Sequence, residues 1–193
     1  MGPSGSGLLA RHAEALALFT ERVHAVRPDQ WDAPTPCAEW SVADLVNHLT
    51  VEQLWVPLLV TQRRTVEDVA DALEGEVLGD DPVTAWDAAA TAAREAFGAP
   101  GALARTVHLS YGRTRASAYC AQMTADAVVH AWDLSRAIGA PERLPDALVD
   151  FTAEEVTPYA GGLEATGLFA APVEPPPGAD AQTRLLALLG RRV

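Results

Sequence analysis

Apolar residues along this chain recur at steps of three and four positions in several long segments, which is the pattern of amphipathic helices. The first segment runs from Leu8 to Val26, and Pro28 ends it because proline cannot continue a helix. The same pattern predicts further helices over residues 42–62, 83–97, 117–138, 146–156 and 181–189. Four principal helices joined by connections predict an all-α protein, a four-helix bundle with extra short helices.

Local signals mark where several of these helices begin and end. Ser41 is a good N-cap residue with Asp44 three positions later, and Asp81 is a cap followed directly by Pro82 in the first turn. Gly139 follows the longest segment, as glycine often does where a helix ends. These residues fix the expected boundaries more closely than the periodicity does.

The segments between the helices carry other patterns. Residues 31–40 contain two prolines and no helical period, so we expect an ordered loop. Residues 65–80 are acidic and weakly periodic, which fits a short helix or a mobile segment, and residues 106–114 predict one small β-hairpin centred on Tyr111-Gly112. The length suits a single domain, residues 1–193, that begins with a flexible leader at residues 1–7.

Composition excludes several classes of partner. The formal net charge is −12, which repels nucleic-acid backbones and anionic lipid surfaces, and no apolar run is long enough to span a membrane. All 14 basic residues are arginine, so a Schiff-base lysine is ruled out. Two cysteines and no secretory signal pattern predict a cytoplasmic protein without disulfides. Alanine-rich helices leave both a monomer and a homodimer open.

The candidate chemistry lies in the two segments that place polar residues among apolar ones. Asp126 and His130 are four residues apart, so a helix points both side chains in the same direction. His48 lies among apolar residues of a second predicted helix and supplies a third ligand. Two histidines and a carboxylate bind a divalent metal while leaving coordination positions open for water or substrate.

Simpler interpretations of the same residues stay open. A carboxylate and a histidine at this spacing often form a weak surface pair, or a buried hydrogen-bonded pair without metal. The apolar neighbours of Asp126 favour the metal, because a buried lone carboxylate is costly without a cation. Asp133 either orients the imidazole of His130 from behind or forms a solvated pair with Arg136.

Other residues are weaker candidates for function. Trp55 lies two helical turns beyond His48 and is expected to wall a substrate pocket. Arg113 and Arg115 precede the Asp126 helix and are candidates to hold an anionic thiol or a substrate carboxylate, although solvated arginines are an equally good interpretation. Structural or surface roles are expected for the remaining cysteines and histidines: Cys37, Cys120, His12, His24 and His108.

The motif D-x-x-x-H-x-W-D-L-x-R-A, with W-S-V-x-D-L-V-x-H-L upstream, resembles the DinB-like metalloprotein superfamily. The resemblance is specifically to the mycothiol-dependent maleylpyruvate isomerase N-terminal-domain group, and the ending T-R-L-L-A-L-L-G-R-R is also similar. It implies a four-helix bundle that holds a divalent metal, usually Zn²⁺, with Ni²⁺ or Fe²⁺ as alternatives. The matching positions are His48, Asp126 and His130. The resemblance implies that the characterised isomerase has glutamate in place of Asp126 and carries a further C-terminal domain, which we do not expect within these 193 residues.

Two functions of different classes are compatible with this sequence. The first is a thiol-dependent transferase or isomerase, in which a metal binds a low-molecular-weight thiol of the mycothiol type and activates it toward a small electrophilic molecule. The second is a non-catalytic module that binds a metal or a small molecule in the bundle. Turnover in the presence of a thiol distinguishes the two.

Overall fold

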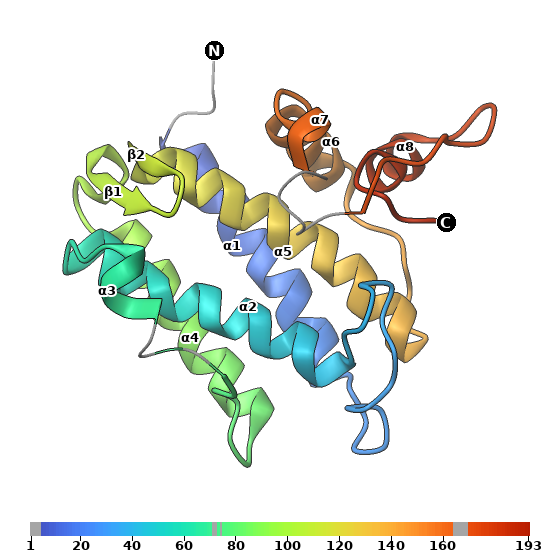
Figure 1. The fold of residues 1–193 in the computed structure, drawn as a ribbon, viewed down its shortest axis with the longest axis horizontal. Helices are drawn as coiled ribbons and strands as arrows, with labels where there is room; N and C mark the ends of the chain where they lie inside the picture. Colours follow the sequence, from blue (N-terminus) through green and yellow to red (C-terminus); the bar gives the residue numbers. More distant parts are fainter. Residues whose placement is uncertain (1–4, 71–72, 74, 164–169) are drawn as a thin grey trace.

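The computed structural model describes residues 5–70, 73, 75–163 and 170–193. Four long helices, α1, α2, α4 and α5, lie along one another and form the body of the molecule (Figure 1). Their bounds are Gly5–His24 (α1), Val42–Val56 (α2), Pro82–Gly98 (α4) and Ala116–Ile138 (α5). The predicted all-α four-helix bundle is confirmed.

Shorter elements complete the described fold. They are the π-helical turn η1 (Pro57–Thr61), α3 (Val66–Ala70), the 3₁₀ turn η3 (Ala102–Ala104), β1 (Thr106–Leu109), β2 (Gly112–Arg115), α6 (Asp146–Val156), α7 (Ala160–Leu163) and α8 (Ala181–Leu188). The hairpin lies at one end of α5, whereas α8 and the C-terminus lie toward its other end (Figure 1). Among the described residues, no helix is both long and apolar enough to cross a membrane.

Helix α5 is the central element of the bundle. It packs against α1, α2 and α6, and most of its side chains are buried, including the fully buried Trp132. Helix α2 packs against α4 and contributes Leu45, Val46 and Leu49 to the same core. Helices α2 and α5 are therefore held in fixed positions by the apolar residues on either side of their polar side chains.

Helix ends follow the predicted signals closely. The Ser41 side chain accepts a hydrogen bond from the Asp44 amide while Asp44 bonds back to Ser41, and Asp81 caps α4 ahead of Pro82. Gly139 ends α5 with φ of 70°. Helix α1 starts at Gly5, three residues before the predicted start, because glycine and serine carry no apolar side chain that would extend the periodicity.

Two predictions need correction. The helix predicted to reach Gln62 ends at Val56 and continues as a π-helical turn, because Pro57 lacks the N–H that would bond to the preceding turn. The hairpin forms, but it turns at Ser110-Tyr111, one residue earlier than predicted, with Leu109 opposite Gly112.

The acidic segment predicted at residues 65–80 contains α3, while residues 71, 72 and 74 lie outside the described part.

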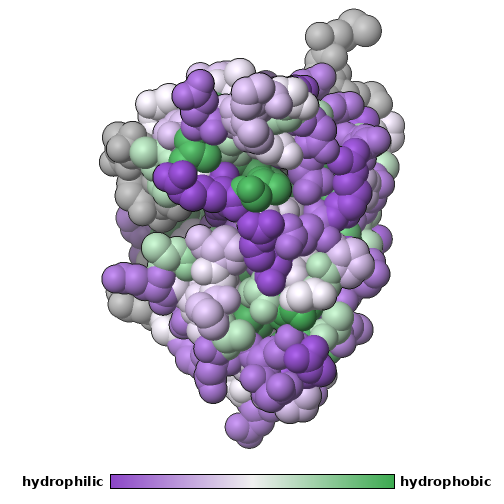
Figure 2. All heavy atoms as spheres, turned by 90° about the vertical axis from the view of Figure 1, so that its right-hand side faces the viewer, coloured by the Kyte–Doolittle hydropathy of each residue, from purple (hydrophilic) through white to green (hydrophobic). Residues whose placement is uncertain are grey.

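The face that carries the C-terminal end is mainly hydrophilic. Seen from the α8 side, its exposed hydrophobic residues form small separate patches among polar ones (Figure 2). This distribution agrees with the acidic composition of the chain and its formal net charge of −12.

Candidate metal centre

Helices α2 and α5 bring the three predicted ligands together. His130 Nε2 lies 3.4 Å from Asp126 Oδ1, and His48 Nε2 lies 3.8 Å from Asp126 Oδ2. The ring centroids of the two histidines are 5.5 Å apart. One donor atom from each of the three residues lies within 4.8 Å of the others. Atoms that share one zinc ion, each at about 2.0–2.2 Å from it, have separations of this order.

The carboxylate of Asp126 has an unsatisfied atom at the centre of this group. Its Oδ2 is buried and accepts no hydrogen bond from the described residues. A buried carboxylate oxygen without a donor is costly unless a cation compensates its charge. Burial alone would raise the pKa of Asp126, but the neighbouring His130 and His48 lower it, so the carboxylate stays ionised. The donor set therefore fits a divalent cation.

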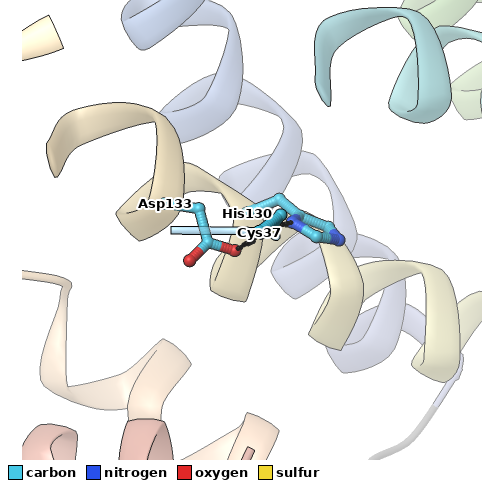
Figure 3. A group of neighbouring side chains, drawn as sticks. All are labelled: Cys37, His130 and Asp133. Atoms are coloured by element: carbon cyan, nitrogen blue, oxygen red, sulfur yellow. Dashed lines mark hydrogen bonds and ion pairs between the residues drawn. The ribbon is translucent and has the colours of Figure 1, made fainter. Parts of the chain in front are cut away.

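The far side of the His130 ring is held by Asp133. Asp133 is fully buried, and its Oδ2 lies 3.0 Å from His130 Nδ1 (Figure 3). Burial would raise the pKa of Asp133, but hydrogen bonds and charges from His130 and Arg191 lower it to about 2. An ionised carboxylate only accepts hydrogen bonds, so Nδ1 donates to it and Nε2 is the nitrogen on the Asp126 side. The alternative pairing of Asp133 with Arg136 is wrong, because Arg136 pairs with Glu142.

Two further residues, both distant in sequence, contact Asp133. Arg191 donates from Nη2 to Oδ2 at 2.9 Å and from Nε to Oδ1 at 3.3 Å. The Cys37 thiol donates to Oδ2 at 3.3 Å and lies 3.8 Å from His130 Nδ1 (Figure 3). Cys37, expected only to pack, thus belongs to a polar cluster that no local sequence pattern indicated. The guanidinium of Arg191 is the cation of this second cluster, which makes Cys37, His130 and Asp133 a poor place for a metal.

Glu52 is a fourth polar residue on the His48 side of the centre. Its Oε1 lies 3.8 Å from His48 Nε2, one turn further along α2. Burial and the charge of Asp126 raise the pKa of Glu52 to about 8. Sequence reasoning missed it, although Glu52 follows His48 at the same four-residue spacing that relates Asp126 to His130. That spacing was the available signal.

An aromatic side chain covers part of the histidine pair. The Trp40 ring centroid lies 4.8 Å from that of His48 and 6.2 Å from that of His130. Trp40 ends the loop of residues 31–40, the loop that also carries Cys37. The predicted ordered loop is therefore one wall of the centre.

The predicted substrate residues lie at different distances from this centre. Trp55 is half-buried on α2, one turn beyond Glu52, and its buried Nε1 has no described hydrogen-bond partner. Arg115 precedes α5 and donates to the Ala104 carbonyl, and Arg113 is exposed in β2. Arg115 is roughly 16 Å along the helix axis from Asp126, so the structure does not bring the hairpin arginines to the ligands.

Of the cysteines and histidines expected to have structural or surface roles, Cys120 and His12 are buried, whereas His24 and His108 are exposed. Cys120 is fully buried, and burial raises its pKa to about 12. His12 is buried against the edge of Phe97, with ring centroids 5.1 Å apart. His24 is exposed and pairs with Asp87, and His108 is exposed in β1.

A family model described as the mycothiol maleylpyruvate isomerase N-terminal domain matches residues 12–135. The chain belongs to this family. The matched region contains His48, Asp126, His130 and Asp133, whereas Arg191 lies outside it. The predicted family resemblance is thereby confirmed.

Relatives and a solved structure agree with this assignment. The uncharacterized proteins MT0763 and Rv0738 of Mycobacterium tuberculosis are each 33% identical over 131 residues, which is 68% of this chain and 67% of theirs. A crystal structure of a mutant mycothiol-dependent maleylpyruvate isomerase aligns with a TM-score of 0.62 and 14% identity. That alignment covers 80% of this chain and 70% of the isomerase chain, and it supports the fold.

Proposed function

We propose that this protein holds a divalent metal through His48, Asp126 and His130 and uses it in a thiol-dependent transfer or isomerisation of a small electrophilic molecule. The observation that carries the proposal is the Asp126 carboxylate, whose Oδ1 lies 3.4 Å from His130 Nε2 and whose buried Oδ2 has no hydrogen-bond partner among the described residues and lies 3.8 Å from His48 Nε2. Two nitrogens and one carboxylate oxygen are the donor set of many open catalytic sites. Such a set leaves room for an exogenous ligand.

The family supports the choice of thiol. The matching family model is named for a mycothiol-dependent isomerase, and the solved neighbour carries the same name. A low-molecular-weight thiol of the mycothiol type is therefore the proposed cosubstrate. When bound, the metal would lower the pKa of the thiol and hold the thiolate ready for attack on the electrophile.

The surrounding residues of this chain have separate parts in the proposed reaction. Asp133 fixes the orientation of the His130 ring through Nδ1. Trp40 shields the histidine pair from solvent on one side, and Trp55 is proposed to line the pocket beyond it. The Glu52 carboxyl lies beside His48, and a bound cation would offset the charge of Asp126 that raises its pKa, so its ionised form would accept the proton that the thiol releases.

Zinc is the proposed metal. Imidazole nitrogens suit Zn²⁺, Ni²⁺ and Fe²⁺ alike, and a single carboxylate oxygen does not favour one of them strongly. Thiol activation requires no change in the oxidation state of the metal, which Zn²⁺ satisfies. Nickel and iron(II) are the alternatives to compare in reconstitution.

Elemental analysis of untagged protein, purified without added metal, tests the site. We expect about one metal equivalent in wild type, retained in the control variant His108→Ala and lost in His48→Ala and His130→Ala, with circular dichroism verifying each fold. His108 is a suitable control because it is an exposed histidine in the hairpin. A wild-type protein that stays metal-free after incubation with zinc, nickel and iron(II) contradicts the proposal.

Turnover then separates catalysis from simple binding. The metal-loaded protein is incubated with a mycothiol-type thiol and a panel of small electrophiles, and loss of the thiol or change of the electrophile is followed. Conjugation or isomerisation that disappears in His48→Ala supports the enzyme. Metal binding without any turnover supports the non-catalytic binding module instead.

A further inference from the structure

The last residues of the described chain return to the centre of the bundle. After α8 the backbone turns at Gly190, and the amide of Arg191 donates to the Leu186 carbonyl at 2.8 Å while that of Gly190 donates to Ala187 at 3.0 Å. These bonds close the end of the helix in the manner of a glycine-terminated C-cap. Arg191 is thereby directed back toward α5.

Gly190 is required at this turn for two reasons. Its φ is 82°, a conformation that residues with a side chain rarely adopt. A Cβ atom at this position would also lie 2.7 Å from Cβ and 2.8 Å from the carbonyl oxygen of Ala170. The backbone path that delivers Arg191 is therefore narrowly defined.

Arg191 is buried and makes a two-point contact with Asp133. Its side chain is 8% exposed, and its Nη2 and Nε atoms bond to the two oxygens of the fully buried carboxylate. The Cys37 sulfur lies 3.7 Å from the same Nη2. A fork-shaped guanidinium that bonds both oxygens fixes the plane of a carboxylate, which a single ammonium charge cannot do.

This contact continues directly into the metal centre. The oxygen of Asp133 that accepts from Arg191 Nη2 is the one that accepts from His130 Nδ1. Rotation of the Asp133 carboxylate would lengthen or break the bond to Nδ1 and release the imidazole ring. The orientation of His130 Nε2 toward Asp126 thus depends on a residue of the C-terminal segment.

The structure assigns Arg191 as a positioning residue that acts through Asp133 to hold the His130 ring in the orientation required for metal binding. The metal role rests on the proposed function, whereas the positioning of His130 is a property of the metal-free protein as well. A buried ion pair by itself is a poor source of stability, because desolvating two charges offsets much of their attraction. A positioning role accounts for retaining this one beside the candidate ligands.

Metal affinity provides the first test. Zn²⁺ binding, measured by competition with a chromophoric chelator, is compared among wild type, Arg191→Lys and Arg191→Met. We expect Arg191→Met to weaken binding by about 10- to 100-fold, the usual effect of losing a residue that orients a metal-bound histidine, with Arg191→Lys in between. The matched control is Arg143→Ala, which removes an exposed arginine that pairs with Asp180 at the start of α8. This control is expected to bind zinc as wild type does.

Proton NMR of the Nδ1–H group of His130 in the metal-free protein provides the second test. Wild type is expected to show a slowly exchanging, hydrogen-bonded Nδ1 proton that is absent in His130→Gln and shifted or lost in Arg191→Met. Arg191→Lys serves if the methionine variant does not fold. An unchanged Nδ1 proton together with wild-type zinc affinity in the folded Arg191 variants overturns the inference while leaving the proposed function intact. If wild type binds no metal, the proposed function fails, and the NMR result alone decides whether Arg191 positions His130.

Discussion

The carboxyl of Glu52 lies 3.8 Å from His48 Nε2, and the Trp40 ring centroid lies 4.8 Å from that of the same imidazole. Glu52 and His48 are one turn apart on α2, so the same helix holds both side chains. A carboxyl group in this position can exchange a proton with a ligand bound at the centre without being one of the three candidate metal ligands.

Glu52→Gln should separate metal binding from turnover. We expect zinc affinity to change by no more than about threefold, while kcat/KM for the thiol-dependent reaction falls by about 10²- to 10⁴-fold, the range typical for loss of a positioned proton acceptor. The measurement is steady-state kinetics on metal-loaded protein. Glu14→Gln, an exposed carboxyl on α1, is the control. Loss of metal from Glu52→Gln would instead identify Glu52 as a ligand.

Asp126 should tolerate a longer acid but not an amide. Asp126→Asn removes the charge that compensates the cation and is expected to lower zinc affinity more than about 100-fold, beyond the effect of a residue that only orients a ligand. Asp126→Glu keeps the negative charge and adds only one methylene, so we expect it to retain stoichiometric zinc. Elemental analysis after dialysis measures both. Equal zinc in wild type and Asp126→Asn would exclude Asp126 as a ligand.

Local sequence signals predicted the long helices and indicated that the three candidate ligands could lie close together, as they do. Ser41, Asp81 and Gly139 gave helix boundaries because capping depends on neighbouring residues alone. Asp126 and His130 were visible as a pair because four-residue spacing on a helix fixes their relative position. His48 could be added because it is polar among buried apolar neighbours.

The remaining residues of the centre depend on tertiary contacts that no local pattern contains. Cys37 reaches Asp133 from an irregular loop, and Arg191 reaches it from the far end of the chain. Pairing across such separations follows from how the helices pack and carries no periodic signature. Arg113 and Arg115 precede α5, whereas Asp126 lies about three turns into that helix, so being near the ligand helix in sequence does not place a residue beside the ligands.

His12 should make the stability of the fold sensitive to acid. Burial, with a smaller contribution from the charge of Arg94, lowers the pKa of His12 from 6.5 to about 4. Between pH 6.5 and about 4, His12 is therefore protonated in the unfolded chain but neutral in the folded protein. The free energy of unfolding is not reduced by this residue above pH 6.5, and it decreases as the pH falls from 6.5 toward 4. Relative to His12→Gln, wild type should lose up to about 3 kcal/mol of its free energy of unfolding across this range.

Urea unfolding of wild type and His12→Gln, at a series of pH values from 8 to 4, measures this difference. At pH 8 the imidazole is neutral in both states, so the difference between the two proteins there reflects packing alone and serves as the reference. Curves of unfolding free energy against pH that stay parallel down to pH 4 would show that His12 does not contribute to acid sensitivity.

A comparison of alanine substitutions at Gly190 and Gly178 measures how much the close contact between Gly190 and Ala170 contributes to stability. Both have positive φ, 82° and 77°, but only Gly190 has another residue within reach of an added Cβ. Gly178→Ala should cost about 1–2 kcal/mol of unfolding free energy for the backbone conformation alone. Gly190→Ala should cost about 1–3 kcal/mol more, because its Cβ collides with Ala170. Urea denaturation measures both. Equal losses of unfolding free energy in the two variants would mean that Ala170 moves away from the added Cβ at little energetic cost. Gly190→Ala should then also keep wild-type zinc affinity, since Arg191 would still reach Asp133.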